Sequence, residues 1–241
     1  MQNDIKISII IPTYNEESNI VILLNNIHVL LSTHKIDHEL IVVDDASKDQ
    51  TRARVKDLCI KIPEIILIER DNERGLASAM VRGYDTARGG YLGAMDADLA
   101  HDPKYLPEMI ELLNSDSADF IIGSRYLPES QFLGKPLLNR IASIVGQSAI
   151  KFLLGVTAND TSNNYRIFRK EIWDKIKNRL HPDGNIMLTE IVYQAQKNNY
   201  KIKEIPIVYQ ERRIGKSKLN IFAETIRFCK NIIKIKKGLK N

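Results

Sequence analysis

A chain of 241 residues, 44% hydrophobic and 27% charged, has the length and apolar content of one large globular domain. Its net charge of +5 comes without the aromatic-rich or helix-turn-helix patterns of nucleic-acid-binding modules, so we expect no nucleic-acid partner, and its two distant cysteines argue against a disulfide framework or a zinc site. The N-terminus lacks the pattern of a secretion signal, and no run of about 18 uncharged apolar residues predicts a bilayer-spanning segment, so a reducing cytoplasmic setting is expected.

The first half of the chain alternates short apolar segments with amphipathic ones. The short segments predict buried strands at residues 7–11, 39–43, 65–68, 91–95 and 120–123. The amphipathic segments predict helices at residues 15–31, 47–58, 77–87 and 103–113. This alternation is typical of an α/β fold with a mostly parallel sheet flanked by helices. Ligands bind beyond the carboxyl ends of the strands in such sheets. There the sequence places acidic residues, namely Glu16, Asp44, Asp45, Asp96 and Asp98.

The second half of the chain has a looser pattern. It predicts an apolar helical stretch at 137–154, a strand-like segment at 165–168 and a last strand at 203–209. Trp173 is expected in the core, whereas His38 and His181 are expected at the surface or in loops. We find no internal repeat or low-complexity linker, and we divide the chain into a globular domain at 1–218 and a basic amphipathic helix at 219–241.

The strongest chemical signal is the segment 95–99, which closes the predicted fourth strand. Asp96 and Asp98, with the small Ala97 between them, can face one divalent cation from a strand end. Mg²⁺ and Mn²⁺ prefer such oxygen ligands and commonly share their coordination shell with diphosphate oxygens. A metal there would offset the charge that develops on a departing diphosphate. The alternative is a loop with solvated acids, because a bare Asp-x-Asp is common.

Two further polar segments follow the first and second predicted strands. In the first, Tyr14 could stack on a base and Glu16 could accept hydrogen bonds from it. Its alternative is a proline turn with acids that favour a helix N-terminus. The second segment, residues 42–51, offers acids to a base or a ribose, and its alternative is a serine or aspartate that caps a helix.

Together these segments resemble the nucleotide-binding half of family 2 glycosyltransferases of the GT-A fold, and in particular the dolichyl-phosphate mannose synthases. The resemblance runs through almost the whole chain. Four further segments carry it: Arg74-Gly75-Leu76-Ala77-Ser78-Ala79, Asp96-Ala97-Asp98-Leu99-Ala100-His101-Asp102-Pro103, Gly123-Ser124-Arg125-Tyr126 and Arg212-Arg213-Ile214-Gly215-Lys216-Ser217-Lys218-Leu219. The last one is the most specific, because family 2 enzymes that act on sugar hydroxyls generally lack its Arg-x-x-Gly-x-Ser-Lys pattern.

The resemblance implies a role for each matching residue. The nucleoside would be held by Pro12, Tyr14, Glu16, Val43 and Asp45. The diphosphate would be bordered by Asp96, Ala97 and Asp98, with Asp96 and Asp98 as ligands of Mg²⁺ or Mn²⁺. Phosphates of the donor or acceptor would be bound by Arg125, Arg212 and Lys218, which form the expected catalytic set with Asp98, and less directly by Arg140 and Ser143 at the lipid phosphate. Guanidinium and ammonium groups suit phosphate oxygens on physical grounds, although Arg212 and Lys218 could instead be solvated charges that face a membrane.

The sequence departs from the family pattern at two places. Some relatives carry a glutamine two residues after the second metal-binding aspartate, where Ala100 has no group to coordinate a metal and water could take the position. The segment from Asp160 to Arg166 replaces the Gly/Ser-Phe-Arg ending of the mannose synthases. This second change lies near the expected sugar and acceptor pocket, so the identity of the sugar stays open.

The two acceptor classes of such enzymes differ in their need for a base. A lipid phosphate is already an anion at neutral pH and can attack the anomeric carbon directly, so alignment and charge stabilisation suffice, and we expect one displacement with inversion. A sugar hydroxyl would need a carboxylate base, and Glu190 lies where family 2 enzymes place that base. The alternative for Glu190 is a helix-surface acid or the partner of a nearby arginine.

The C-terminal segment carries most of the positive charge. Residues 212–241 contain ten Lys or Arg and one Glu, so they account for about +9 and leave the preceding body at about −4. Phe222, Ile226, Cys229 and Ile233 recur at helical spacing among the basic residues, as in an interfacial amphipathic helix. We expect this helix to hold the protein on anionic lipid, the alternative being a helix packed on the domain with a solvated basic face.

The resemblance therefore implies transfer of mannose from GDP-mannose to a polyprenyl phosphate, by a peripheral protein on the inner, cytoplasmic face of a membrane. Two alternatives stay open: the same acceptor with UDP-glucose or another nucleotide sugar, and a polysaccharide-building family 2 enzyme with Glu190 as base. The sequence also leaves open whether a separate membrane subunit is a partner.

Overall fold

The computed structural model describes residues 6–134, 137–181, 184 and 186–210. Two parts of the expected machinery lie outside these residues. They are the pair Arg212 and Lys218 and the amphipathic helix expected at 219–241.

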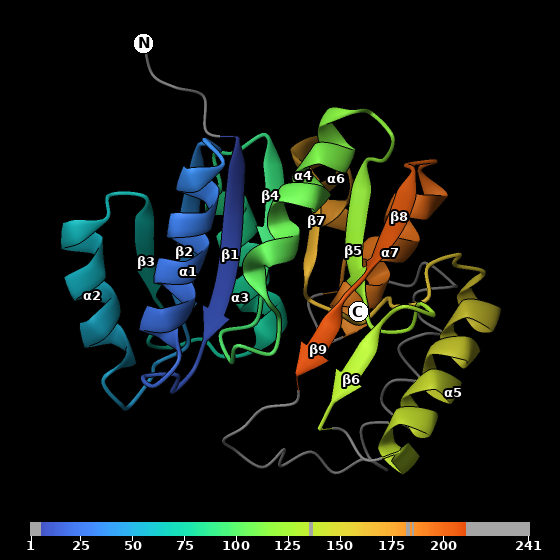
Figure 1. The fold of residues 1–241 in the computed structure, drawn as a ribbon, viewed down its shortest axis with the longest axis horizontal. Helices are drawn as coiled ribbons and strands as arrows, with labels where there is room; N and C mark the ends of the chain where they lie inside the picture. Colours follow the sequence, from blue (N-terminus) through green and yellow to red (C-terminus); the bar gives the residue numbers. More distant parts are fainter. Residues whose placement is uncertain (1–5, 135–136, 182–183, 185, 211–241) are drawn as a thin grey trace.

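A seven-stranded sheet forms the centre of the molecule, in the order β3-β2-β1-β4-β7-β5-β8 (Figure 1). Its strands are β1 (Ile7–Thr13), β2 (His38–Asp44), β3 (Ile65–Glu69), β4 (Tyr91–Ala94), β5 (Phe120–Ser124), β7 (Arg166–Arg169) and β8 (Ile202–Pro206). Only β7 runs antiparallel to its neighbours β4 and β5 in this sheet, and the other pairs are parallel. The predicted mostly parallel α/β sheet is therefore confirmed.

Six helices cover the two faces of the sheet (Figure 1). One face carries α1 (Ile20–Thr33), α2 (Thr51–Lys61) and α4 (Leu106–Asn114), which follows a short 3₁₀ turn at Pro103–Tyr105. The other face carries α3 (Leu76–Thr86), α6 (Lys170–Ile176) and α7 (Ile186–Lys197), with a 3₁₀ turn at Lys177–Arg179 after α6. Because helices cover both faces, β1 and β2 are buried on both sides, which explains their continuous apolar sequences.

Close packing holds α3 against the centre of the sheet. A Cβ atom at Gly83 would lie only 2.5 Å from a methyl carbon of Ile10 in β1, so only glycine fits there without displacing Ile10. Trp173 is buried in the core, as predicted, and it lies on the same side of the sheet as α3. The centroid of its ring is 4.8 Å from that of the Tyr84 ring. This packing places the N-terminus of α3 near the carboxyl end of β1.

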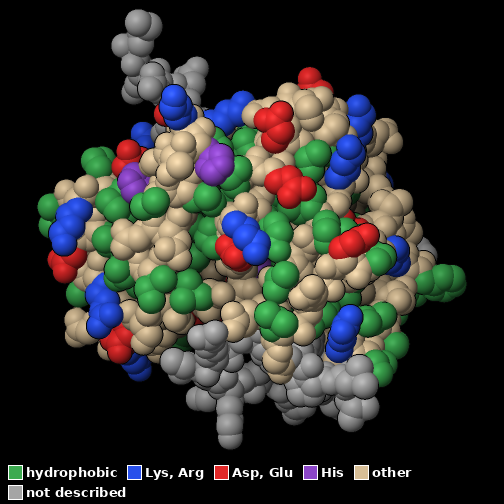
Figure 2. All heavy atoms as spheres, in the orientation of Figure 1, with side chains coloured by type: hydrophobic (Ala, Val, Ile, Leu, Met, Phe, Trp, Pro, Cys, Tyr) green, Lys and Arg blue, Asp and Glu red, His purple; other side chains and the backbone are tan. Residues whose placement is uncertain are grey.

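Helix α5 (Leu137–Leu154) stands apart from the sheet, beside the two-stranded parallel pair of β6 (Gln131–Leu133) and β9 (Val208–Gln210) (Figure 1). It buries Ile150 and Leu154 against Val156 and Ile186. Ile141, Ile144, Val145, Phe152 and Leu153 of this helix are exposed, and Figure 2 shows hydrophobic side chains projecting along the edge where α5 lies in Figure 1. Within the described part of the chain, no helix combines the length and hydropathy that crossing a bilayer requires.

Several element boundaries differ from the sequence predictions. α1 begins at Ile20 rather than at residue 15, and α2 begins at Thr51 rather than at residue 47, because the intervening residues form turns that bond to each other. The strand expected at 203–209 is two strands, β8 and β9, separated at Ile207. His38 was expected at the surface or in a loop but is buried in β2, where its Nδ1 lies 2.8 Å from the Ile36 carbonyl oxygen.

Candidate active site

A pocket of about 490 Å³ opens at the carboxyl ends of β1, β2 and β4. Parallel strands bring their following loops to one edge of the sheet, which explains why residues distant in sequence meet there. The pocket is lined by Pro12, Thr13, Tyr14, Glu16, Asp45, Leu76, Asp96, Ala97, Arg125, Ser162, Asn163, Asn164 and Leu188. Seven of the residues singled out from the sequence are among them: Pro12, Tyr14, Glu16, Asp45, Asp96, Ala97 and Arg125.

The loops after β1 and β2 are hydrogen-bonded to each other. Asn15 has a φ of 55° and Ala46 a φ of 58°, so both loops turn sharply in the left-handed region at non-glycine residues. The amide of Asn15 donates to Ser47 Oγ at 2.9 Å, and the amide of Glu16 donates to Thr51 Oγ1 at 2.9 Å. Because these bonds use the backbone groups of residues 15 and 16, Glu16 lies in a turn before α1 and not in the first turn of the helix.

Asp45 is held at the rim of the pocket by two groups from the loop before α3. Its Oδ2 accepts a hydrogen bond from the Gly75 amide at 2.8 Å, and its Oδ1 lies 3.0 Å from Arg70 Nη1. Burial raises the pKa of Asp45, while the Gly75 amide and Arg70 oppose the rise. Val43, by contrast, is packed in the core beneath this loop and does not line the pocket.

Asp96 and Asp98 follow β4, and the chain after them turns through Leu99, which has a φ of 61°. Asp96 lines the pocket and accepts a hydrogen bond from Asn164 Nδ2 at 3.0 Å, whereas Asp98 accepts one from the Ala100 amide at 3.1 Å. The Oδ1 atom of Asn164 is buried and has no hydrogen-bond partner in the described structure. Asp96 and the unpaired amide oxygen of Asn164 offer oxygen donors of the kind that a hard divalent cation prefers. Asp98 does not line the pocket, and the described residues contain no cluster of three or more acidic, histidine or cysteine side chains that could hold a metal.

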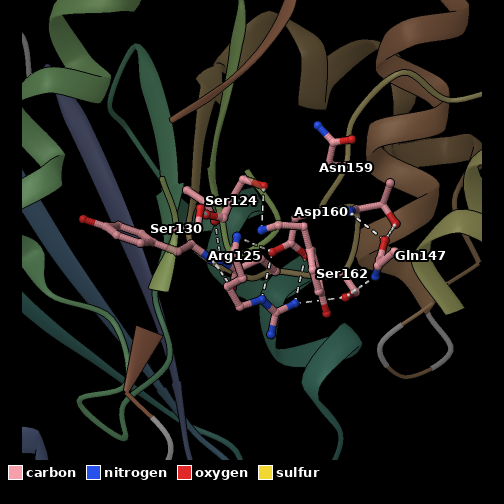
Figure 3. A network of polar contacts seen from close by, with 12 residues as sticks. Ser124, Arg125, Ser130, Gln147, Asn159, Asp160 and Ser162 are labelled. Carbon is pink, nitrogen blue, oxygen red and sulfur yellow. Dashed lines mark hydrogen bonds and ion pairs between the residues drawn. The ribbon is translucent and has the colours of Figure 1, made fainter. Parts of the chain in front are cut away.

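Arg125 enters the pocket from the end of β5 and is fixed by Asp160 (Figure 3). Its Nε and Nη2 donate to the two carboxylate oxygens of Asp160 at 2.8 and 2.9 Å, and its backbone amide donates to the same carboxylate at 3.0 Å. Burial alone would lower the pKa of Arg125, but the adjacent Asp160 carboxylate more than offsets this and the pKa is raised. The guanidinium therefore stays charged, and the bidentate pairing fixes its orientation.

The loop that carries Asp160 is itself anchored from two sides. Glu204 in β8 accepts hydrogen bonds from the Asp160 amide at 2.8 Å and from the Asn159 amide at 2.9 Å. Arg166 is completely buried and donates to the carbonyl oxygens of Thr161 and Leu188 at 3.1 and 2.7 Å. Burial lowers the pKa of Arg166 to about 10. These anchors make the loop from 159 to 163 a rigid wall of the pocket.

Arg140 and Ser143 lie on α5 and do not line this pocket. The Arg140 guanidinium lies 5.3 Å from the Phe132 ring, and Phe132 in turn lies 5.6 Å from the Tyr126 ring. Arg125 lies 5.5 Å from Tyr126, so the two arginines contact the same small aromatic cluster. This cluster therefore connects the Arg125 wall of the pocket to α5.

Glu190 was expected to be a helix-surface acid, an arginine partner or a base, and the first of these expectations is wrong. It is 1% exposed in α7, and both of its carboxylate oxygens bind His181, one at the backbone amide and one at Nδ1, each at 2.7 Å. Burial raises the pKa of Glu190, and the hydrogen bonds from His181 oppose the rise. Glu190 does not line the pocket, whereas Leu188 of the same helix does.

Sequence reasoning missed the wall opposite the nucleotide segments. Ser162, Asn163 and Asn164 were noticed only as a departure from a family pattern, and Asp160 was not recognised as the partner of Arg125. The signal available was the run of six polar residues at 159–164, between Ala158 and Tyr165. Leu188 left no signal, because a leucine in an amphipathic helix is indistinguishable from a core residue before the helix is placed.

Comparisons with known proteins identify similar sequences over most of the chain. The profile of the family described as "Glycosyl transferase family 2" matches residues 8–177. A dolichol-phosphate mannosyltransferase from Pyrococcus furiosus is 35% identical over 89% of this chain and 59% of its own length. A polyprenol monophosphomannose synthase from Mycolicibacterium smegmatis is 32% identical over 88% of this chain and 80% of its own length. The chain thus spans less than two thirds of the first relative and most of the second.

Solved structures share the fold at lower sequence identity. A glucosyl-3-phosphoglycerate synthase from Mycobacterium tuberculosis, in complex with Mn²⁺, uridine-diphosphate and phosphoglyceric acid, superposes with a TM-score of 0.70. It is 17% identical, and the alignment covers 98% of this chain and 80% of that one. At this identity the likeness concerns the arrangement of the elements.

Proposed function

Since the chain belongs to glycosyl transferase family 2, we propose that it transfers a sugar from a nucleotide-sugar donor to a polyprenyl phosphate. GDP-mannose is the proposed donor and mannose the proposed sugar. The relatives at 35% and 32% identity are named as a dolichol-phosphate mannosyltransferase and a polyprenol monophosphomannose synthase. Two features together support this choice of acceptor. Arg125, which is ion-paired with Asp160, lines the pocket, whereas Glu190 does not line it.

The nucleotide-binding part of the proposal rests on the loops after β1 and β2. Tyr14 is half exposed and lines the pocket, so its ring is available to a base. Asp45 and Glu16 line the same wall and offer carboxylate oxygens to base or ribose donors. Val43 would act only through its backbone, because its side chain is buried.

Asp96 and Asp98 are the proposed ligands of a divalent metal, Mg²⁺ or Mn²⁺, with Ala97 beside the diphosphate. Such a metal would neutralise charge on the diphosphate as it leaves. Asn164 supports this arrangement, because its amide nitrogen orients the Asp96 carboxylate and its free oxygen adds to the oxygen donors nearby. Structures of the glucosyl-3-phosphoglycerate synthase contain Mn²⁺ or Mg²⁺ with uridine-diphosphate, which supports a divalent metal in this fold.

The residues of the pocket suit an acceptor that needs no base. A phosphate oxygen already carries the negative charge of the nucleophile, so the protein has only to bind and align it. Arg125 supplies a charged, rigid donor for this purpose, and Arg212, Lys218, Arg140 and Ser143 are proposed to assist. Glu190 does not line the pocket and both of its carboxylate oxygens bind His181, which supports an acceptor that needs no hydroxyl-activating base.

A polyprenyl acceptor requires access to a lipid surface, and α5 supports that access. Ile141, Ile144, Val145 and Phe152 are exposed on this helix, and Phe152 is 87% exposed. Together with the basic segment 212–241, such a face favours peripheral association with an anionic membrane. The sequence pointed only to the C-terminal segment for this role, and α5 is a second proposed contact.

The test is a product assay with purified protein, Mn²⁺ and a short-chain polyprenyl phosphate. GDP-mannose, UDP-glucose and UDP-N-acetylglucosamine are supplied in turn, and glycolipid is detected by mass spectrometry. We expect mannolipid from GDP-mannose, lost in Asp98→Ala and retained in Glu190→Gln. Product from a UDP-sugar would correct the donor, whereas product only from oligosaccharide acceptors, lost in Glu190→Gln, would overturn the lipid-phosphate proposal.

A further inference from the structure

Gln147 is a buried polar side chain on α5, the helix that exposes Ile144 and Val145 on its outer face. It is 7% exposed, and both ends of its carboxamide bind the loop at the edge of the pocket (Figure 3). Its Nε2 donates to Ser162 Oγ at 2.7 Å, and its Oε1 accepts from the Thr161 amide at 3.2 Å and from Thr161 Oγ1 at 3.1 Å. The amide orientation is therefore fixed, because the Thr161 backbone amide can only donate.

Ser162 connects this helix to the charged group of the pocket. Its Oγ accepts from Arg125 Nη2 at 3.2 Å as well as from Gln147 Nε2 (Figure 3). A hydroxyl oxygen has two lone pairs, so these two donors use both of them. The position of Ser162 Oγ thus depends on both partners, and moving Gln147 changes the geometry around the Arg125 guanidinium.

Asp160 and Gln147 restrain Arg125 in different ways. Asp160 binds Nε and Nη2 through a short ion pair and keeps the guanidinium charged. Arg125 Nη2 also donates a hydrogen bond to Ser162 Oγ, and Ser162 is in turn held by Gln147 on α5 rather than by a residue of the sheet. Nη1 makes no hydrogen bond to the described residues, which leaves this group for a ligand in the pocket.

We propose that Gln147 is a positioning residue for acceptor binding, which acts through Ser162 to hold Arg125 and so couples the lipid-facing helix α5 to the phosphate-binding group. This inference rests on the proposed lipid-phosphate acceptor. It assigns to α5 a role beyond contact with lipid: the helix that would lie against the membrane also holds part of the pocket wall. The apolar residues Ile144 and Val145 lie within one turn of Gln147.

The test compares Gln147→Leu with wild-type protein, using a short-chain polyprenyl phosphate in detergent micelles and the nucleotide sugar that the wild type uses. We expect the KM for the lipid phosphate to rise about tenfold, the size that a removed coupling between neighbours can produce. The kcat and the Kd of the nucleotide sugar should stay within about twofold, because Gln147 does not line the pocket. Ser148→Ala is the matched control, since Ser148 is exposed and its one side-chain hydrogen bond to the described residues goes to the carbonyl of Ile144 in its own helix.

A double-mutant cycle separates positioning from general loosening of the fold. If Gln147 acts through Ser162, adding Gln147→Leu to Ser162→Ala changes the KM for lipid phosphate by less than about twofold. The inference is overturned if the two effects multiply, if Gln147→Leu leaves this KM unchanged, or if nucleotide-sugar affinity falls as much as acceptor affinity. Wild-type protein that makes no glycolipid would instead overturn the proposed function, and this inference with it.

Discussion

Asp160 is completely buried, and its carboxylate is shared between the guanidinium and the backbone amide of Arg125. A pair this deep contributes little over two apolar residues, but removing one partner leaves the other charge buried and uncompensated. We therefore expect the Arg125–Asp160 pair to orient the guanidinium rather than to add to the stability of the fold. It fixes a cation at the wall of a pocket where phosphate would be bound.

Asp160→Ala should lower the free energy of unfolding by about 1–3 kcal/mol, because it removes the carboxylate that pairs with Arg125, while water can reach the 15% exposed Arg125 side chain and replace part of the lost interaction. Urea denaturation followed by circular dichroism measures this change. The matched control is Asp174→Ala, which removes an exposed aspartate 3.9 Å from Lys177 and should change the free energy by less than about 1 kcal/mol. Equal changes in the free energy of unfolding would contradict this prediction, because they would show that the Asp160–Arg125 pair contributes no more to stability than the exposed Asp174–Lys177 pair.

Glu190 offers a prediction on pH. Its pKa is raised mainly by burial, so the folded state favours the protonated carboxyl group more than the unfolded state does. That contribution to stability is fully present below the unfolded pKa and is lost as pH rises through the folded value. Glu190→Gln, which is always neutral, should therefore gain in melting temperature relative to wild type as pH rises from 4 to 7, by about a few degrees. A difference that does not change with pH would contradict this.

At the scale of elements, α5 differs from the other helices in the face it exposes. The sequence predicted its bounds, residues 137–154, correctly, because a long apolar stretch at helical spacing has few alternatives. The sequence could not say which apolar residues would be covered. In the structure Ile150 and Leu154 pack on Val156 and Ile186, whereas Ile141, Ile144, Val145, Phe152 and Leu153 stay at the surface.

Replacing Val145 and Phe152 together by serine should weaken binding to anionic vesicles by about a hundredfold or more, since burying each side chain in lipid contributes on the order of 1.5–3 kcal/mol and tenfold corresponds to about 1.4 kcal/mol. Co-sedimentation with phosphatidylglycerol vesicles measures it. The control is Ile60→Ser on α2, where the isoleucine is 83% exposed but far from α5 in the fold. Vesicle binding that is unchanged in the double variant would remove α5 from the proposed membrane contact.

The starts of α1 and α2 show why boundaries were harder to predict than elements. Glu16 and Glu17 looked like acids of a first helical turn, because negative charge is favoured there. In the structure the amide of Glu17 donates to Asp49 Oδ2 at 3.2 Å, and the amide of Gln50 donates to Glu17 Oε2 at 2.9 Å. These bonds join two loops that are more than 30 residues apart, and local sequence patterns carry no information about such pairings.

At the scale of the whole molecule, the pocket is assembled from strand ends on both sides of β4, so a ligand that fills it should stabilise the entire fold. Mn²⁺ with GDP, at about 100 times the Kd, should add about 2.7 kcal/mol and raise the melting temperature by roughly 5–10 °C. Differential scanning fluorimetry measures the shift. Chelation by EDTA should remove most of it, and Asp98→Ala should behave like chelated wild type. A shift that survives both would exclude Asp98 as a metal ligand.

The sequence by itself determined the α/β class, the order of the first strands and helices, and the acids at the ends of β1, β2 and β4. It could do so because strand burial and helical spacing are local properties, and because the ends of parallel strands share one edge. Only the tertiary structure decided that Asp160 pairs with Arg125, that Glu190 turns to His181 and that Gln147 joins α5 to the pocket. These contacts join side chains whose elements have no fixed relative position until the core has packed, and hydrogen-bond geometry is set only then.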